Sequence, residues 1–166
     1  MIFVTVGTHE QPFNRLLECM DKLVKDSTIN EEVIIQSGYS TYVPKQCKWQ
    51  KLFPYTEMEK YIAEARIVIT HGGPSSFIMP LLIGKTPIVV PRKFKFDEHV
   101  NNHQVDFCNA VMERMGTIIV VEDTDKLGEI IKNYDEIVNG INIGTVSNNQ
   151  KFNFEFKKIV FSIFKD

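Results

Sequence analysis

Three short runs of β-branched and aliphatic residues constrain the fold of this chain more than any other feature. They lie at residues 67–70, 88–90 and 118–121, and polar side chains do not alternate with apolar ones within them. Residues 2–6 also have the character of a buried strand. Strands without polar alternation are usually covered on both faces, as in a parallel sheet with helices on either side.

Amphipathic stretches with helical spacing separate these strands. The helices are predicted at residues 13–24, 56–65, 75–83, 101–114 and 124–138. Two more strands are predicted at residues 33–35 and 49–53, and Thr56 and Glu59 have the spacing of a capping box. This alternation predicts an α/β fold, a Rossmann-like doubly wound parallel sheet with right-handed crossovers.

The pattern shows no internal repeat and no second domain, so we expect one domain over residues 1–138. Residues 139–150 are rich in Asn, Gly and Ser and predict a loop. Residues 151–166 contain five phenylalanines and predict a C-terminal amphipathic helix. That helix either packs on the domain's own sheet or contacts a partner protein or a membrane surface.

Composition and charge narrow the class of protein. The chain has 166 residues, 43% of them hydrophobic, and a formal net charge of −2, so we expect no nucleic-acid partner. Cys19, Cys47 and Cys108 form no CxxC pair, which argues against a disulfide framework or a structural zinc site and favours the cytosol. No signal peptide and no run of about 20 apolar residues is present, so a soluble protein is expected, which can still work beside a membrane.

Two glycine-containing loops follow predicted strands. Gly7, Thr8 and His9 come after the first strand. The loop after residues 67–70 contains His71, Gly72, Gly73, Pro74, Ser75 and Ser76. Ligands of doubly wound sheets bind beyond the carboxyl ends of the strands, where the strand order reverses. If the order is the common one, these two strands are neighbours and both loops face one crevice.

The chemistry of these loops favours an anion such as a diphosphate. Glycine allows the backbone to approach a ligand closely, and a helix that begins near Pro74 and Ser75 directs N–H groups and its positive dipole end outward. The alternative interpretation is a glycine turn between strand and helix that binds nothing. The fingerprint GxGxxG and the P-loop signature are both absent, which disfavours an NAD site.

Polar side chains crowd residues 96–110, after the strand at 88–90. Glu98, His99, His103 and Gln104 belong to this group, and carboxylates and amides suit the neighbouring hydroxyls of a sugar. A plain solvated loop is one alternative. A metal site is another, because His99 and His103 are four residues apart, although no HExxH pattern supports it.

Three motifs together resemble one known family. The stretches "FVTVGTHEQPFNRLL", "ARIVITHGGPSSF" and "GKTPIVVPRKFKFDEHVNNHQ" resemble the C-terminal, nucleotide-sugar-binding half of the family 28 glycosyltransferases. The likeness is closest to stand-alone half-enzymes of bacterial capsule and exopolysaccharide synthesis. It extends to the cytosolic subunit of the eukaryotic two-part N-acetylglucosaminyltransferase that acts on dolichol-linked sugars. The resemblance covers roughly residues 1–140.

The resemblance implies the C-terminal half of a GT-B fold and a UDP-hexose as donor. It also implies a separate membrane-associated subunit that supplies the N-terminal half and a polyprenyl-diphosphate-linked acceptor. That subunit would hold this chain at the inner face of the plasma membrane, in the cytoplasm. The reaction would be an inverting hexosyl transfer that needs neither a metal nor another cofactor.

The resemblance further implies roles for single residues. Gly7 and Thr8 would lie beside the diphosphate, and His9 is a candidate for the catalytic base, which the partner could supply instead. We expect the UDP-sugar to be bound also by His71, Gly72, Gly73, Ser75, Ser76, Arg92, Glu98, His99, His103 and Gln104. Arg92 and the N–H groups of the glycine loop would stabilise the departing UDP. Met79 stands where related enzymes often have an acidic residue that holds the ribose hydroxyls.

Two other hypotheses stay open. The chain could be a non-catalytic subunit that recruits or stabilises a catalytic glycosyltransferase. It could also be a nucleotide-binding sensor with a flavodoxin-like topology. Binding of UDP by the isolated chain would favour the transferase.

Overall fold

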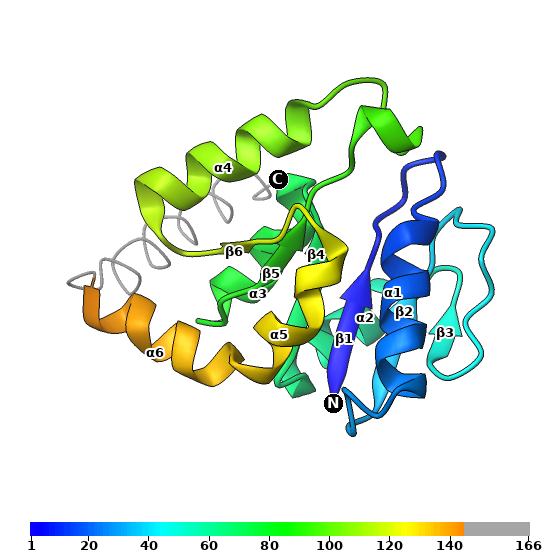
Figure 1. The fold of residues 1–166 in the computed structure, drawn as a ribbon, viewed down its shortest axis with the longest axis horizontal. Coiled ribbons are helices and arrows are strands. Elements are labelled where there is room, and N and C mark those ends of the chain that lie inside the picture. Colours follow the sequence, from blue (N-terminus) through cyan, green and yellow to red (C-terminus); the bar gives the residue numbers. More distant parts are fainter. Residues whose placement is uncertain (145–166) are drawn as a thin grey trace, which may run out of the picture.

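A parallel sheet of six strands runs through the centre of the molecule, in the order β3-β2-β1-β4-β5-β6 (Figure 1). The computed structural model describes residues 1–144. The strands are β1 (Ile2–Thr5), β2 (Val33–Gln36), β3 (Lys48–Gln50), β4 (Ile67–His71), β5 (Ile88–Val90) and β6 (Ile119–Val120). All neighbours pair in parallel, which confirms the predicted doubly wound sheet, and β1 lies beside β4 as the common order requires.

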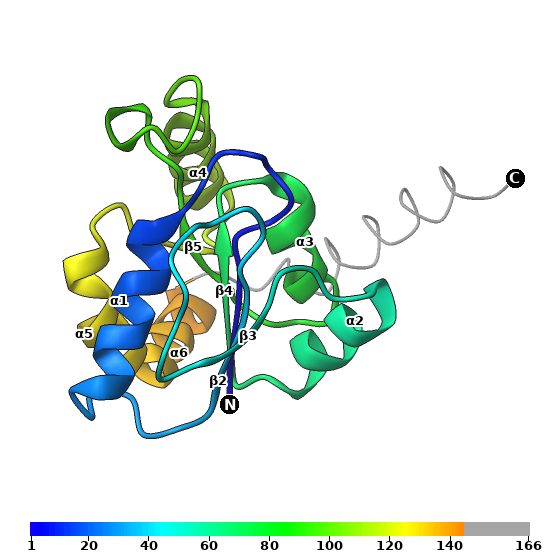
Figure 2. The ribbon, with the colours of Figure 1, turned by 90° about the vertical axis from the view of Figure 1, so that its right-hand side faces the viewer.

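Helices cover both faces of this sheet (Figure 2). They are α1 (Asn14–Lys25), α2 (Tyr55–Glu64), α3 (Pro74–Leu82), α4 (His103–Met115), α5 (Leu127–Lys132) and α6 (Tyr134–Gly144), with 3₁₀ turns η1 (Phe94–Phe96) and η2 (Thr124–Lys126). α1, α5 and α6 lie on one face, and α2, α3 and α4 on the other. No helix within residues 1–144 is long and apolar enough to cross a bilayer.

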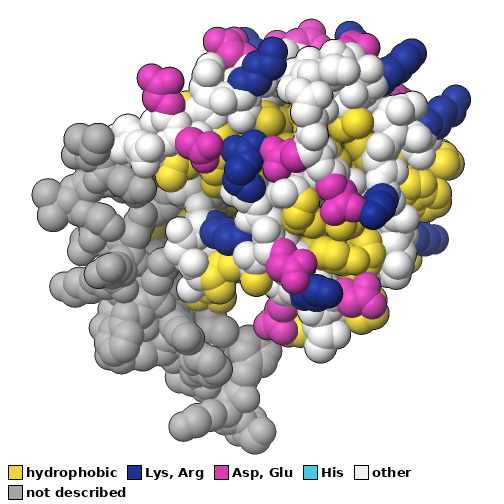
Figure 3. All heavy atoms as spheres, turned by 90° about the horizontal axis from the view of Figure 1, so that it is seen from below, with side chains coloured by type: hydrophobic (Ala, Val, Ile, Leu, Met, Phe, Trp, Pro, Cys, Tyr) yellow, Lys and Arg dark blue, Asp and Glu magenta, His cyan; other side chains and the backbone are white. Residues whose placement is uncertain are grey.

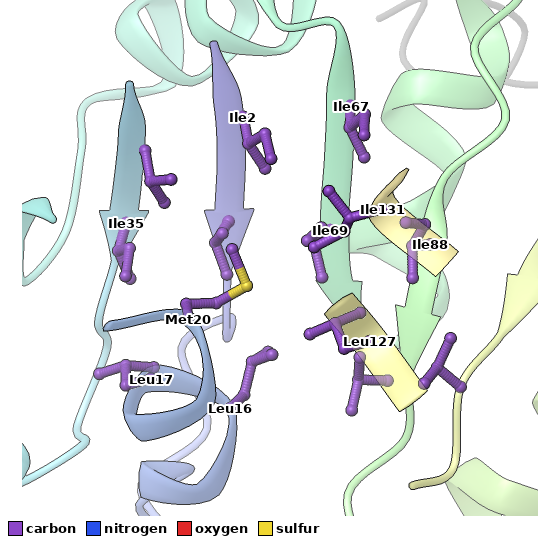
Figure 4. Close-up of a cluster of buried hydrophobic side chains, with 14 of the residues drawn as sticks. Ile2, Leu16, Leu17, Met20, Ile35, Ile67, Ile69, Ile88, Leu127 and Ile131 are labelled. Carbon is purple, nitrogen blue, oxygen red and sulfur yellow. The ribbon is translucent and has the colours of Figure 1, made fainter. Parts of the chain in front are cut away.

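The larger part of the core lies between the sheet and the layer of α1 and α5 (Figure 4). The side chains that meet there include Ile2, Ile35, Ile67, Ile69 and Ile88 from the sheet, Leu16, Leu17 and Met20 from α1, and Leu127 and Ile131 from α5. Each of them is at most 3% exposed. Their burial supplies the hydrophobic stabilisation that fixes the helices on the sheet.

Alternate residues of the same strands are buried on the opposite face. Phe3 and Val68 pack there with residues of α2, and Val89 packs with residues of α3 and α4. The ring of Phe3 stacks on that of Tyr61 with 5.5 Å between their centroids. Because both faces of β1, β2, β4 and β5 are covered, most of their positions carry apolar side chains, which explains why these strands show no polar alternation.

Two local expectations differ from the structure. The predicted capping box at Thr56 does not form, because α2 begins one residue earlier, after Pro54, and no side chain caps it. α6 extends to Gly144, into the segment 139–150 predicted as a loop, because Ile137, Val138 and Ile141 continue an apolar stripe that packs on the core. The predicted Phe-rich helix at 151–166 lies outside the described residues.

The edge where the strands begin carries charges of both signs, and Figure 3 shows acidic and basic side chains interspersed on this face. Ion pairs join Glu31 to the N-terminal amino group and to Arg66, Arg66 to Asp135, and Lys48 to Glu32. Exposed pairs of this kind contribute little to stability. This edge is a solvated surface, on the opposite side of the molecule from the strand ends that build the candidate site.

Candidate functional site

A cleft of about 510 Å³ opens beyond the carboxyl ends of β1, β2 and β4. The loops that follow β1, β4 and β5 gather at this edge of the sheet (Figure 1). The cleft is lined by Thr5, Gly7, Thr8, His9, Gln36, Met58, His71, Ser75, Ser76, Met79, His99 and Gln104. Eight of the predicted site residues are therefore brought together, and they are Gly7, Thr8, His9, His71, Ser75, Ser76, His99 and Gln104. Their roles toward a ligand stay predictions.

The loop after β1 forms one wall of the cleft. Gly7 has a φ of +74°, a conformation that side chains rarely adopt, and its N–H donates to Thr5 Oγ1 over 3.2 Å. A Cβ at this position would lie 2.3 Å from Cε1 of His71. Glycine is therefore required at position 7 both by the backbone and by the neighbouring imidazole.

His71 ends β4, and its ring lies against both glycine loops. A Cβ on Gly73 would lie 2.3 Å from His71 Nε2. Burial, together with the nearby charge of Arg92, lowers the pKa of His71 to about 4. The imidazole is therefore neutral at pH 7, and the glycines provide the space in which it sits. The sequence predicts either close approach of a ligand or a plain turn at these glycines, and it does not reveal the packing of His71 against them.

α3 directs its amino end into the cleft. Gly73 is the N-cap residue and Pro74 occupies the first turn, where its missing N–H costs nothing. The N–H of Ser76 donates to the Gly73 carbonyl over 3.0 Å. Ser75 and Ser76 both line the cleft, so their hydroxyls and the positive end of the helix dipole meet any ligand placed there.

Gln104, in the first turn of α4, joins the ends of two strands. Its Oε1 accepts hydrogen bonds from Gly72 N and Arg92 N, each over 3.1 Å. Because the amide oxygen is used twice in this way, its NH₂ group is the end left for the cleft that Gln104 lines. The side chain thus couples the β4–α3 turn to the loop after β5 and offers donors to a ligand.

Two histidines from different loops stack at the mouth of the site. The ring centroids of His9 and His99 are 5.0 Å apart, and His9 Nε2 lies 2.9 Å from Gln11 Oε1. Burial and then the neighbouring His9 lower the pKa of His99. The stacked rings therefore link the β1–α1 loop to the loop after β5.

The charge of the cleft is unusual for an anion site. Among the described residues that line it there is no Asp, Glu, Lys or Arg, and histidine is the only ionisable type. Within residues 1–144 no three His, Cys, Asp or Glu side chains are placed to hold a metal ion. Attraction for a diphosphate must therefore come from the helix end, from N–H and O–H donors, and from protonated histidine.

A second wall of the cleft contains Met79, which the resemblance places near the ribose, together with Gln36 and Met58, which were not singled out from the sequence. Gln36 ends β2, Met58 comes from α2 and Met79 from α3. Gln36 directly follows the strand predicted at 33–35, so the rule that ligands bind at strand ends could have found it. Met58 carries no such signal, because a methionine on an amphipathic helix normally predicts core packing.

Arg92 is predicted to bind the ligand, but the structure buries it completely beneath the cleft. Its Nη1 donates to the carbonyls of Gln11 over 2.7 Å and Glu98 over 3.1 Å, and Nη2 donates to that of Val6 over 2.9 Å. Burial lowers the pKa of the Arg92 guanidinium, the charge of Glu98 raises it, and the net value is about 10. The group is therefore charged at pH 7. Arg92 shapes the site and does not line it.

Glu98 and His103 are likewise not among the lining residues. The carboxylate of Glu98 is 2% exposed, pairs with Arg15 over 2.9 Å and accepts from Lys93 N over 3.0 Å. The carboxylate of Glu98 therefore stabilises the loop that follows β5. His103 is exposed at the start of α4, where its ring stacks on Phe107. Gly72 and Gly73 shape the turn without lining the cleft.

Comparison with known proteins identifies the family of this domain. The pattern that defines the glycosyltransferase family 28 C-terminal domain matches residues 1–160. A UDP-N-acetylglucosamine--N-acetylmuramyl-(pentapeptide) pyrophosphoryl-undecaprenol N-acetylglucosamine transferase from Caldicellulosiruptor saccharolyticus is 30% identical over 87 residues. That match covers 52% of this chain and 22% of the relative, so the chain spans about a fifth of the relative's length.

Solved structures with the same fold are glycosyltransferases. The calicheamicin glycosyltransferase CalG4 matches 99% of this chain and 43% of its own, with a TM-score of 0.54 and 14% identity. SnogD from Streptomyces nogalater matches 73% of this chain and 30% of its own, with a TM-score of 0.54 and 19% identity. At such identities the likeness shows the fold alone. The family pattern covers nearly the whole chain, which belongs to glycosyltransferase family 28 as a C-terminal domain.

Proposed function

We propose that this chain is the UDP-sugar-binding subunit of a two-component inverting glycosyltransferase. The enzyme transfers a hexose to a polyprenyl-diphosphate-linked sugar in capsule or exopolysaccharide biosynthesis. A membrane-associated partner supplies the other half of the enzyme and the acceptor site, and holds this chain at the inner face of the plasma membrane.

One observation carries the proposal: the amino end of α3 opens into the cleft of a family 28 domain. Ser75 and Ser76 add hydroxyl donors at this helix end, which favours a doubly charged diphosphate. Gln104 offers its amide to a sugar attached to that diphosphate. The volume of about 510 Å³ lies in the usual range for small-molecule sites.

The name of the curated relative supports the substrate classes. That relative is named as a transferase that uses UDP-N-acetylglucosamine and an undecaprenol-linked acceptor. It therefore supports a UDP-linked sugar as donor and a polyprenol-linked sugar as acceptor. The partner belongs to the proposal because the three motifs quoted above resemble half-enzymes that act in two-part complexes.

In the proposed reaction, the acceptor hydroxyl attacks the anomeric carbon of the hexose and gives its proton to a base. The bond between that carbon and the diphosphate oxygen breaks, and UDP leaves with the electron pair. The α3 amino end and the serine hydroxyls stabilise the negative charge that grows on the diphosphate. His9 is the candidate base within this chain, since it lies in the cleft and hydrogen-bonds Gln11.

A non-catalytic subunit is the second candidate function. It is favoured by the absence of Asp, Glu, Lys and Arg among the described residues that line the cleft. A subunit of this kind would stabilise its partner, and loss of His9 would leave the activity of the complex unchanged.

The test is a thermal-unfolding panel of the full chain with UDP, UDP-glucose, UDP-galactose, UDP-N-acetylglucosamine, UDP-glucuronate and GDP-mannose. A ligand at about 100 times its Kd stabilises the protein by about 2.7 kcal/mol, which raises the melting temperature measurably. We expect the uridine ligands to raise it and GDP-mannose not to.

Replacement of both Ser75 and Ser76 by Ala should weaken the uridine ligands about tenfold, since each lost hydrogen bond costs about 0.5–1.5 kcal/mol. Thr56→Ala is the matched control, because Thr56 is an exposed hydroxyl in the first turn of α2 that caps nothing. If no uridine ligand shifts the melting temperature of the native chain, the donor-binding proposal is wrong.

A further inference from the structure

The wall of the cleft formed by α2 and α3 carries two methionines. Met58 and Met79 pack on one side against the buried cluster that contains Phe3 and Val68, and on the other side they line the cleft. They are thus anchored in the core and present thioether groups to whatever the cleft holds.

The position of Met79 relates this wall to the ligand. Met79 follows Ser75 by four residues on α3, so the two share a face and lie about 6 Å apart along the helix axis. If the diphosphate sits at the amino end of α3, as the proposed function requires, the ribose attached to it falls beside Met79. The transferred hexose, at the other end of the diphosphate, then extends in the opposite direction, toward Gln104 and the histidines.

The polar groups on the same wall already have partners. Thr5 Oγ1 accepts hydrogen bonds from Gly7 N over 3.2 Å and from Gln36 Nε2 over 3.0 Å. Gln36 Oε1 accepts from Phe53 N over 2.9 Å. The oxygens of Thr5 and Gln36 therefore already accept hydrogen bonds inside the protein, which leaves neither side chain a strong free acceptor for a ribose hydroxyl.

Carboxylates are the groups that usually bind ribose hydroxyls, and none is found among the described residues that line the cleft. A thioether is a weak acceptor but packs well against an aromatic ring. We propose that Met58 and Met79 hold the nucleoside by apolar contact and that the cleft does not read the 2′-hydroxyl. The chain therefore accepts 2′-deoxyuridine diphosphate donors about as well as uridine diphosphate donors, an inference that rests on the proposed function.

Titration calorimetry of the full chain with UDP and 2′-deoxy-UDP tests the proposal. We expect the two dissociation constants to agree within about threefold, because a site rejects an analogue strongly only when it hydrogen-bonds the missing group. Met79→Glu, which supplies a carboxylate beside the ribose, should make UDP bind about tenfold or more tightly than 2′-deoxy-UDP. Met79→Leu is the matched apolar control and should keep the ratio near one.

The outcomes separate this proposal from the proposed function. If neither nucleotide binds the native chain, both are overturned. If UDP binds and 2′-deoxy-UDP is at least tenfold weaker, only the present proposal is overturned, and loss of that preference in Ser76→Ala would assign the reading to Ser76. A folded Met79→Glu variant that binds UDP without any preference would overturn the placement of the ribose beside Met79.

Discussion

His71 occupies the space that side chains at residues 7 and 73 would need. The two positions differ in backbone conformation, since Gly7 has a φ of +74° whereas Gly73 has a φ of −76° that alanine adopts freely. The three described atoms nearest to a Cβ at position 73 all belong to the imidazole of His71, so contact with this ring is the steric reason for glycine there. A substitution at Gly73 therefore tests how tightly the neutral imidazole of His71 is held.

We expect Gly73→Ala to lower the free energy of unfolding by about 1–3 kcal/mol, because the new Cβ must displace the ring of His71. Urea unfolding followed by circular dichroism measures the change. Gly140→Ala is the control, since among the described residues no atom beyond its chain neighbours and the backbone of α6 lies within 4 Å of a Cβ there, and it should stabilise α6 by about 0.5–1 kcal/mol. A Gly73→Ala variant as stable as the native chain would refute the contact, as would additive effects in the double variant with His71→Ala.

His9→Ala tests the chemical role of the stacked histidine. If His9 is the catalytic base, the turnover of the complex with its partner should fall at least about 100-fold while UDP binding to the chain is kept. Lys132→Ala, an exposed substitution on α5, should change neither quantity. A loss of UDP affinity with unchanged turnover per bound donor would instead make His9 a binding residue.

The sequence could predict which loops meet at one edge of the sheet, whereas the roles of their residues toward a ligand stay predictions. Gly7 and Ser75 could be placed at one crevice because parallel strands end at the same edge of the sheet. Arg92 and Glu98 could not be excluded, since no local pattern tells a buried guanidinium bound by distant carbonyls from one that faces a ligand. The neutral state of His71 also depends on burial, which only the packed structure reveals.

At the scale of elements, one carboxylate holds the segment between β2 and β3 against α1. Asp21 is 5% exposed and accepts hydrogen bonds from Lys45 N over 2.9 Å, Gln46 N over 2.6 Å and the hydroxyl of Tyr42 over 2.8 Å. Burial alone would raise the pKa of Asp21, but these donors together hold it below its ordinary value of 3.8. The helix thereby fixes a segment that has no regular structure of its own.

Asp21→Asn should lower the free energy of unfolding by about 2 kcal/mol at pH 7, because hydrogen bonds to a charged acceptor are lost. Since the pKa of Asp21 is lower in the folded state, its contribution is present above about pH 4 and disappears as the pH falls through the folded value. Chemical denaturation at several pH values should therefore show the native chain and the variant converging in acid. Asp26→Asn, at the exposed end of α1, should stay within about 0.5 kcal/mol of the native chain throughout.

Strands were easier to anticipate than helix boundaries. Buried runs such as Ile88–Val90 could be predicted because a strand covered on both faces must be apolar at every position. The start of α2 could not, since Pro54 and Thr56 both suit the beginning of a helix and tertiary packing decides between them. α6 continues through asparagines and glycines because its apolar stripe reaches the core, and packing overrides local propensity there.

At the scale of the whole molecule, the net charge of −2 and a cleft with no fixed charge among its described lining residues make anion binding depend on histidine. The groups whose charges act on His99 are His9 from the β1–α1 loop and Arg92 from the end of β5. Both disfavour protonation of His99 in the empty cleft. The negative charge of a bound diphosphate opposes the effects of His9 and Arg92 and favours the protonated form of His99.

The affinity for a UDP-hexose should therefore rise as the pH is lowered from about 8 to about 5.5, because binding takes up a proton. A UDP-hexose is the right ligand, since its diphosphate does not titrate in this range. Calorimetry in buffers of different ionisation enthalpy measures the proton uptake directly. The double variant His9→Gln and His99→Gln should abolish the pH dependence of the affinity. An affinity of the native chain that does not change between about pH 8 and about pH 5.5 would contradict this prediction.

The contacts of Arg92 determine when, during synthesis of the chain, the cleft can form. Arg92 donates to the carbonyls of Val6 and Gln11, which precede it by 86 and 81 residues. At about 5–20 residues per second, the first cleft loop leaves the ribosome roughly 4–17 s before the arginine that braces it. A nascent chain that ends before residue 92 lacks this brace, so the nucleotide cleft can take shape only once most of the domain has been synthesised.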